Sequence, residues 1–259
     1  MASQAPAEHN FKLTLHWLNQ SRSQRIVWLL EELKLPYEVK LYERNKDYLA
    51  PPELKEVHPL GKSPVIVLEA PALSKPLVLA ESGTIVEYLT EHFGQWLAPK
   101  QYAPGKEGQL GGETEEWLRY RYFMHYTEGS LMAIMVVWVI IQKIKNAPVP
   151  FFIKPITNMI GGNVEKSFTQ PNFDNHFALI ESQLNTSPNG GDFICGKELT
   201  GADILMIFPL ESAVNRGVIT QDKYPKICDY VSKIQQREAY QRASQKIKEI
   251  EGSDKTSKI

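Results

Sequence analysis

A proline placed directly before an apolar run limits how the first half of this chain can fold. Pro64 precedes Val65-Ile66-Val67-Leu68, and because proline lacks a backbone N–H it is tolerated in a sheet mainly at edges, at bulges or at the first residue of a strand. The run therefore predicts a strand that begins at Val65. If the Ser63–Pro64 bond is cis, the backbone N–H and C=O of Ser63 point outward, where an extended ligand can pair with them as an added strand would.

A second motif, Ala80-Glu81-Ser82-Gly83, precedes an apolar helical pattern. At a helix start, free N–H groups, the positive end of the helix dipole and the Ser82 hydroxyl can hold a carboxylate, while Glu81 can hold an ammonium group. Taken singly, the two motifs are an ordinary loop-to-strand boundary and an ordinary N-cap. Together they predict a site for a small peptide that carries an ammonium and a carboxylate on one carbon.

Hydrophobic patterns place both motifs in one unit of strands and helices. Residues 11–17 and 37–42 alternate apolar and polar side chains, as strands with one buried face do. Between them, residues 26–33 repeat apolar side chains at helical spacing. A hairpin over residues 65–79 and a helix over residues 82–93 follow. The predicted order is therefore βαβ followed by ββα, with a parallel crossover between the first two strands.

The second half of the chain is predicted to be all helical. A Pro- and Gly-containing linker covers residues 94–112, and apolar residues from Trp117 to Ile141 then recur at steps of three and four, which predicts a helix of about 30 residues. A Pro- and Gly-containing stretch at residues 146–162 is interpreted as an interruption. Further helices follow, one of them opened by Thr200-Gly201-Ala202-Asp203, in which the Asp203 carboxylate accepts from the backbone of Thr200 as a structural capping box.

The uninterrupted apolar run at residues 131–141 admits a membrane interpretation. It is too short to span a bilayer, which needs roughly 20 such residues, and its side chains continue the helical stripe that precedes it. A fully buried core helix is therefore the favoured interpretation. Peripheral association with an internal membrane stays open but is not favoured.

Composition excludes several classes of function. A formal net charge of −1 gives no electrostatic reason to expect nucleic acid as a partner. Two cysteines make neither a disulfide framework nor a metal-ligand cluster, so no metal and a reducing, cytoplasmic location are expected. Residues 1–10 lack the pattern of a signal peptide and are interpreted as a flexible tail. Residues 249–259 are interpreted as a charged tail.

Several motifs resemble those of the glutathione transferases, in particular a fungal, yeast-type branch with bacterial relatives. They are Trp28-Leu29-Leu30-Glu31-Glu32-Leu33, His58-Pro59-Leu60-Gly61-Lys62-Ser63-Pro64, Leu79-Ala80-Glu81-Ser82-Gly83 and Leu199-Thr200-Gly201-Ala202-Asp203-Ile204. The resemblance implies an α+β fold with a thioredoxin-like, glutathione-binding domain at residues 11–93. It also implies an all-helical bundle domain at residues 113–248. It further implies that glutathione is the co-substrate and that the protein is a homodimer.

The chemistry implied by this family is stabilisation of the glutathione thiolate. A free thiol has a pKa near 8.5, so it is mostly protonated at neutral pH although the thiolate is the nucleophile. Serine-type members place a hydroxyl at the start of the first helix, which favours Ser21, with Asn19 and Ser23 as alternatives in the same loop. Ser21 and Gln24 also form an S-x-x-Q capping box, so the hydroxyl can instead accept from the backbone of Gln24. An alignment to better-known serine members shifts the expected hydroxyl toward Gln20.

Contacts with the rest of glutathione carry over from the motifs. The resemblance implies that Ser63 pairs with the cysteinyl backbone, that Pro64 sets the geometry of this loop, and that Glu81 and Ser82 hold the γ-glutamyl group. Lys62 has the charge for either ligand carboxylate. Arg44 and Lys46 are candidates for the glycyl carboxylate by charge alone. Tyr120, Phe123 and Met124 are predicted to line the pocket for the electrophile, although aromatic side chains at helical spacing are more often part of a core.

The resulting prediction is a detoxifying glutathione transferase that conjugates the thiolate to hydrophobic electrophiles, with peroxide reduction as a side activity. A thiol transferase or dehydroascorbate-type reductase of the same fold needs a cysteine at the start of the first helix, and the loop has none. The alternative from another class is a non-catalytic module of the same fold that binds apolar ligands or a protein partner. The presence of the glutathione-binding residues Glu81, Ser82 and Ser63 argues against that module.

Overall fold

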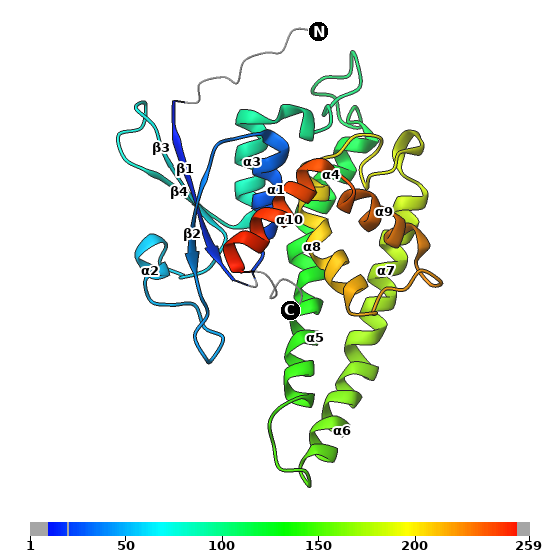
Figure 1. The fold of residues 1–259 in the computed structure, drawn as a ribbon. Helices are drawn as coiled ribbons and strands as arrows, with labels where there is room; N and C mark the ends of the chain where they lie inside the picture. The colour runs from blue at the N-terminus through cyan, green and yellow to red at the C-terminus, as the bar shows by residue number, and fades with distance from the viewer. Residues whose placement is uncertain (1–9, 20, 253–259) are drawn as a thin grey trace. The chain divides into compact units, whose positions relative to one another are not determined.

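The computed structural model describes residues 10–19 and 21–252. By its internal contacts the chain divides into two compact units (Figure 1). The first contains the residues up to Leu97 together with those from Ile234 onward, and the second is Ala98–Lys233. The predicted tails at residues 1–10 and 249–259 lie largely outside the described residues.

The first unit is built on a four-stranded mixed sheet. Its strands are β1 (Lys12–Leu18), β2 (Glu38–Tyr42), β3 (Val65–Glu69) and β4 (Leu77–Ala80), in the spatial order β2-β1-β3-β4. β1 and β2 pair in parallel, whereas β3 is antiparallel to both β1 and β4. Its first helices are α1 (Gln24–Leu33), a short α2 (Leu54–Val57) and α3 (Ser82–Phe93), followed by the 3₁₀ turn η1 (Gln95–Leu97). The predicted βαβ-ββα order and the thioredoxin-like, α+β fold class are confirmed.

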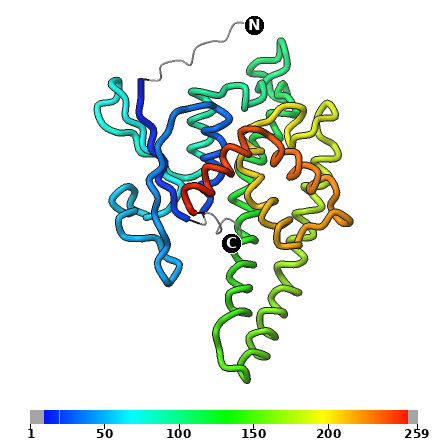
Figure 2. The backbone as a smooth tube through the Cα atoms, in the orientation of Figure 1, coloured from blue at the N-terminus to red at the C-terminus, as the bar shows by residue number. Residues whose placement is uncertain are grey.

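The helix α10 (Glu238–Glu251) belongs to the first unit and lies along α1 (Figures 1 and 2). The sequence pattern placed these residues in the second domain and in the charged tail, so the contacts group them differently. The Tyr240 ring packs edge-on against Trp28 of α1. Arg237, the N-cap of α10, forms an ion pair with Glu32. Because α10 covers one side of α1 and the sheet covers the other, α1 is buried on both faces, Val27 and Trp28 included.

The second unit is helical throughout its regular structure. It contains α4 (Glu115–Tyr126), the π-helical turn η2 (Thr127–Leu131), α5 (Met132–Lys145), α6 (Lys154–Val164), the π-helical turn η3 (Glu165–Thr169), α7 (Gln170–Asn185), the 3₁₀ turn η4 (Pro188–Gly190), α8 (Gly201–Asn215) and most of α9 (Pro225–Gln235). The predicted helix of about 30 residues is confirmed, since Glu115–Lys145 runs as one helix of 31 residues. At the start of α8, Asp203 Oδ2 accepts from the Thr200 backbone N–H at 2.8 Å, as the capping box predicts.

Two expectations for this unit are wrong. The stretch at residues 146–162 contains most of α6, because Pro155 stands in the first helical turn, where a proline is tolerated. Gly161 is accepted within α6 because α5 passes close to it. A Cβ at this position would lie 2.4 Å from the Lys145 side chain of α5, so the close approach of the two helices favours a glycine. The apolar run at residues 131–141 is not fully buried either, since Val136 is 42% and Ile140 52% exposed.

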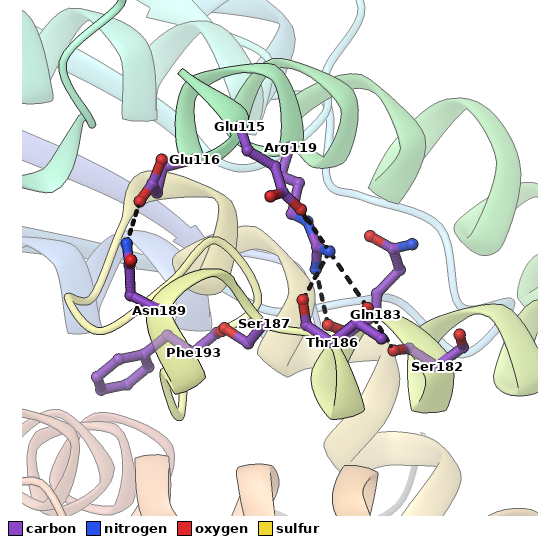
Figure 3. Close-up of polar contacts among 9 residues, drawn as sticks. All are labelled: Glu115, Glu116, Arg119, Ser182, Gln183, Thr186, Ser187, Asn189 and Phe193. Carbon is purple, nitrogen blue, oxygen red and sulfur yellow. Dashed lines mark hydrogen bonds and ion pairs between the residues drawn. The ribbon is translucent and has the colours of Figure 1, made fainter. Parts of the chain in front are cut away.

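Arg119 of α4 holds the C-terminal end of α7 (Figure 3). Its guanidinium donates to the carbonyl oxygens of Gln183 at 2.8 Å and Thr186 at 2.7 Å, and it also pairs with Glu115. The last carbonyl groups of a helix have no intrahelical partner. One side chain of α4 therefore supplies donors to two carbonyl groups at the end of α7.

Candidate functional site

The loop before β3 presents a backbone edge with unused hydrogen-bonding groups. The Ser63–Pro64 peptide bond is cis, and β3 begins at Val65 as predicted. The backbone N–H and C=O of Ser63 form no hydrogen bond with any residue that the structure describes. Both groups are thus available to the backbone of an extended ligand, as the sequence argument requires.

The side chain of Ser63 lies at the end of a chain of three serine hydroxyls. Ser63 Oγ donates to the carbonyl oxygen of His16 at 2.8 Å and accepts from the backbone N–H of Leu18 at 3.1 Å. Since its proton is used, Ser23 Oγ is the donor in the 2.5 Å contact between Ser23 and Ser63. Ser21 Oγ in turn donates to Ser23 Oγ at 2.9 Å. The three hydroxyls join the loop after β1 to the cis loop before β3.

These contacts bear on two of the three candidates for the thiol donor. Ser23 is completely buried, and its hydroxyl both donates and accepts within the protein. Ser21 is 9% exposed and gives its proton to Ser23, while its oxygen accepts from the Ser23 backbone N–H at 3.2 Å. The capping box between Ser21 and Gln24 is not formed, because Ser23 is the N-cap of α1 and the Gln24 amide donates to Tyr240 of α10. Gln20 lies outside the described residues.

Asn19, the third candidate, keeps a free donor. Its side-chain oxygen Oδ1 accepts from the backbone N–H of Arg44 at 2.9 Å, which identifies the other atom of the amide as the NH₂ group. No described residue accepts a hydrogen bond from this NH₂ group. The Arg44 guanidinium also donates to the Asn19 carbonyl oxygen at 3.1 Å, so backbone and side chain are both fixed. Asn19 directly follows Leu18, whose backbone N–H donates to Ser63 Oγ in the cis loop.

The start of α3 carries the second predicted motif. Glu81 is the N-cap and has φ 69°, a left-handed conformation that costs a non-glycine residue about 1–3 kcal/mol and is found mostly at functional sites. Ser82 is buried, and its Oγ accepts from Nη1 of Arg25 at 3.2 Å. Because Oγ accepts this bond, the hydroxyl proton of Ser82 can donate to an anion. Arg25 lies fully buried beneath the helix start and adds positive charge there.

A pocket brings most of the predicted glutathione contacts together. It is lined by Arg22, His58, Leu60, Lys62, Ser63, Pro64, Ala80, Glu81 and Ser82. One wall is the cis loop and the other is the start of α3. All five residues predicted to bind glutathione line it. A peptide lying in this pocket would meet backbone donors and acceptors on one side and a helix N-terminus on the other.

The chain is similar to proteins of known family over most of its length. The family described as Glutathione S-transferase, N-terminal domain, matches residues 21–92, and that described as Glutathione S-transferase, C-terminal domain, matches residues 150–238. Glutathione S-transferase 1 of Saccharomyces cerevisiae is 32% identical over 238 residues, which are 92% of this chain and 96% of that protein. The chain belongs to the glutathione S-transferase family.

Solved structures agree with this assignment. A glutathione S-transferase from Actinobacillus pleuropneumoniae is 30% identical, with a TM-score of 0.62 over 94% of this chain and 97% of its own. A glutathione transferase from Phanerochaete chrysosporium, crystallised with oxidised glutathione, shares the fold at 18% identity, with a TM-score of 0.67 over 96% and 100% of the two chains. The predicted resemblance to a fungal branch with bacterial relatives is confirmed. The protein is a glutathione S-transferase, and glutathione is its co-substrate.

The residues predicted to bind the glycyl carboxylate and the electrophile do not line this pocket of the glutathione S-transferase. The Arg44 guanidinium holds the carbonyl oxygens of Asn19 and Tyr48, so it has a structural task, whereas Lys46 is exposed. Tyr120, Phe123 and Met124 are buried in the second unit, and their role in the electrophile pocket stays a prediction. Within residues 10–19 and 21–252, no group of three or more His, Cys, Asp or Glu side chains is arranged to hold a metal ion.

The sequence predicted no glutathione-binding role for Arg25, which donates to Ser82, or for His58, which lines the pocket. Nothing in the sequence indicates that Arg25 donates to Ser82, which is 57 positions away. His58 belongs to the quoted motif His58-Pro59-Leu60, and its place in the pocket follows from the turn that brings this motif back to α3. The short distance in sequence between His58 and the cis proline Pro64 was the signal that could have identified His58 as a residue of the pocket.

Proposed function

We propose that this glutathione S-transferase stabilises the glutathione thiolate with the Asn19 amide and adds the thiolate to hydrophobic electrophiles, with peroxide reduction as a side activity. The observation that carries the proposal is the NH₂ group of Asn19, which donates to no residue that the structure describes and which lies one residue after Leu18, the hydrogen-bond partner of Ser63. Lowering a thiol pKa from about 8.5 by about two units corresponds to roughly 2.7 kcal/mol. A preorganised amide donor together with the N-terminus of α1 supplies stabilisation of this size.

Preorganisation favours Asn19 over the serines. A donor stabilises an anion most when it needs no rearrangement as the charge forms, and the Asn19 amide is already held through its oxygen by Arg44. For Ser21 to donate to sulfur, its proton must leave Ser23. For Ser23 to donate, a fully buried hydroxyl must leave Ser63. Asn19 alone among the three has a donor that no described residue uses.

The proposed pose of glutathione follows from the pocket. The cysteinyl backbone pairs with the backbone N–H and C=O of Ser63. The γ-glutamyl ammonium lies against the Glu81 carboxylate. The γ-glutamyl carboxylate accepts hydrogen bonds from the Ser82 hydroxyl and from the backbone N–H groups at the start of α3. Lys62, exposed at the rim, adds charge attraction for a ligand carboxylate. This pose directs the cysteinyl side chain toward the loop that follows β1.

The test is a thiol titration with matched variants. Asn19→Asp keeps an oxygen for the Arg44 N–H but removes the NH₂ donor, whereas Asn19→Gln retains an NH₂ donor one methylene further out. Thiolate absorbance of bound glutathione is followed against pH for both variants, the wild type and Ser21→Ala. We expect Asn19→Asp to raise the bound thiol pKa by at least about one unit and to lower kcat for a model electrophile by about tenfold.

The serine variant is the comparison that decides between the candidates. Ser21→Ala is expected to leave the thiol pKa within a few tenths of a unit of the wild type. A raised pKa in Ser21→Ala with an unchanged pKa in Asn19→Asp would return the role to Ser21. Retention on glutathione-agarose without a lowered thiol pKa and without turnover would favour the non-catalytic binding module. The homodimer, the detoxifying role and the cytoplasmic location stay predictions.

A further inference from the structure

The antiparallel helices α5 and α6 extend together beyond the other helices of the second unit (Figures 1 and 2). We call residues 136–160, which contain the outer part of both helices and the turn between them, the hairpin. Phe151 and Phe152 at its turn are 88% and 65% exposed. Six further apolar side chains of the hairpin are also exposed: Val136, Ile140, Ile144, Ile156, Met159 and Ile160.

An apolar surface of this kind needs a covering partner. Single exposed apolar side chains are normal on a protein surface, but a contiguous apolar patch marks an interaction site. The exposed residues of α6 recur at steps of three and four, so they form one stripe along the helix that continues the two phenylalanines. The patch is therefore continuous from the turn along α6.

Fixed contacts give the hairpin a defined shape. Lys145 of α5 and Glu165, just after α6, form an ion pair at 2.5 Å, and Gln142 donates to the same carboxylate. Gly161 lets α6 approach Lys145 closely, as a side chain there would collide with it. Lys154 donates to the carbonyl oxygen of Ala147 across the turn at 3.2 Å. The two phenylalanines are thus presented at the end of a braced pair of helices.

The charge of this segment identifies the partner. Residues 129–164 contain no Asp or Glu, and their charged residues are Lys143, Lys145 and Lys154, of which Lys145 is paired with Glu165. A second copy of the chain would bring the same positive charges to the interface, where like charges repel. Lysines beside exposed phenylalanines and isoleucines match a lipid surface with anionic headgroups, since the apolar side chains enter the acyl boundary and the lysines stay at headgroup level.

The segment is too strongly anchored in the protein to span a bilayer. The helix Glu115–Lys145 is long and apolar enough to cross a membrane by length and composition alone. Its first half, however, carries Glu115, Glu116 and Arg119 and packs against α8. The outer part of α5 and α6 offer the apolar side chains of the hairpin outward without acidic residues among them, which fits shallow insertion at the interface.

From these observations we propose that the hairpin inserts Phe151 and Phe152 into the surface of an anionic membrane, with α5 and α6 as the support. The sequence did not favour a membrane, because the apolar run at residues 131–141 was interpreted as fully buried. The exposed apolar side chains in this run and on the adjoining α6 show that the segment is not fully buried. The inference does not depend on the proposed thiol chemistry, since none of the hairpin residues lines the glutathione pocket.

The test is flotation of the full chain with lipid vesicles. Vesicles of phosphatidylcholine alone are compared with vesicles that also contain phosphatidylserine, at low and high salt. The wild type is expected to float with the anionic vesicles and to be released by salt. The double variant Phe151→Ser, Phe152→Ser should bind at least about tenfold more weakly, whereas Phe151→Leu, Phe152→Leu should retain binding.

Controls separate the membrane from other occupants of the surface. Leu110→Ser, at an exposed leucine in a turn outside the hairpin, should float like the wild type. Glutathione affinity, turnover and molar mass in solution should be the same for all variants. Equal binding to neutral and anionic vesicles, no flotation of the wild type, or retained flotation of the serine double variant would overturn the proposal. A lower molar mass of that double variant would assign the surface to a second copy of the chain and would also overturn it.

Discussion

The hydroxyls of Ser21, Ser23 and Ser63 hold two loops of the glutathione pocket together. Each hydroxyl has one proton to donate, and the protons pass in sequence from Ser21 to Ser23, from Ser23 to Ser63 and from Ser63 to the His16 carbonyl oxygen. A donor is therefore left only at a residue outside this chain of bonds. At the scale of single residues, these hydrogen bonds are the reason that Asn19 is proposed as the thiol donor, although serine was the residue type favoured by the family resemblance.

Sequence reasoning succeeded for residues whose role depends on their immediate neighbours and failed where distant residues decide. Pro64 and Glu81 were identified because a proline before a strand and an acid before a helix have local meaning. Whether Ser21 keeps a free proton depends on Ser63, which meets Ser23 from 40 positions away. The burial of Arg25 under Ser82 is likewise a tertiary contact. No spacing rule along the chain reports such contacts.

Removing the Ser82 hydroxyl should weaken glutathione binding. Arg25 occupies the oxygen of Ser82 as an acceptor, so the hydroxyl proton is available to the γ-glutamyl carboxylate. A hydrogen bond to a charged group contributes about 1.5 kcal/mol or more, so Ser82→Ala should raise the Kd by roughly tenfold in calorimetric titration. Ser74→Ala, in the exposed turn between β3 and β4, is the control and should bind normally. An unchanged Kd in Ser82→Ala would contradict the proposed pose.

His16 should make stability depend on pH. Burial, with a smaller effect of the Lys40 charge, lowers the pKa of His16 from its ordinary 6.5, while its ring bonds the Tyr42 hydroxyl at 2.8 Å. Below pH 6.5 His16 is protonated in the unfolded chain, whereas in the folded protein it takes up a proton only at lower pH. The stabilising effect of neutral, buried His16 is therefore present above pH 6.5 and is lost as the pH falls. His16→Gln should flatten the dependence measured by urea unfolding between about pH 7.5 and pH 5.5. Parallel pH profiles for both proteins would rule out this role.

At the scale of elements, packing partners matter more than helical pattern. The sequence pattern assigned residues 238–248 to the helical second domain and the residues after them to a charged tail, whereas α10 (Glu238–Glu251) packs on α1 of the first unit. The α6 segment was missed because Pro155 and Gly161 were interpreted as breakers. The structure uses the proline in the first turn and the glycine at a close helix contact. Whether a proline or glycine ends a helix therefore depends on its position in the helix and on the residues that pack against it.

Arg119 should be important for the stability of the second unit. It is the only side chain in Figure 3 that bonds both Gln183 and Thr186 at the end of α7. Arg119→Ala leaves these carbonyl oxygens without their donor and should lower the free energy of unfolding by about 2 kcal/mol. Thermal unfolding followed by circular dichroism measures the loss. Arg121→Ala, at an exposed position on the same helix, should cost much less, and equal losses would show that α7 does not depend on this contact.

At the scale of the whole molecule, the end of the chain completes the unit that binds glutathione. Ala239, Tyr240, Ala243 and Ile247 of α10 are buried, and the carboxylate of Glu251 accepts from Trp17 of β1 at 3.0 Å. Gln24, the first residue of α1, donates to the Tyr240 hydroxyl, so the contact reaches the helix that follows the loop proposed to face the thiol. Formation of the glutathione pocket thus depends on residues at both ends of the sequence. Binding by the isolated first 97 residues is not expected.

A truncation tests this dependence. A chain that ends at Arg237 lacks α10 and exposes Trp28, which is otherwise fully buried. Losing the burial of a few large apolar side chains costs on the order of 3–6 kcal/mol, a large part of the 5–15 kcal/mol that stabilises a typical domain. We expect the truncated chain to lose glutathione binding while it retains helical circular dichroism from the second unit. A chain that ends at Gly252 keeps α10 and should bind glutathione as the full chain does. Normal glutathione affinity in the shorter chain would mean that the sheet and α1 form the pocket unaided, and that α10 only covers a surface that tolerates water.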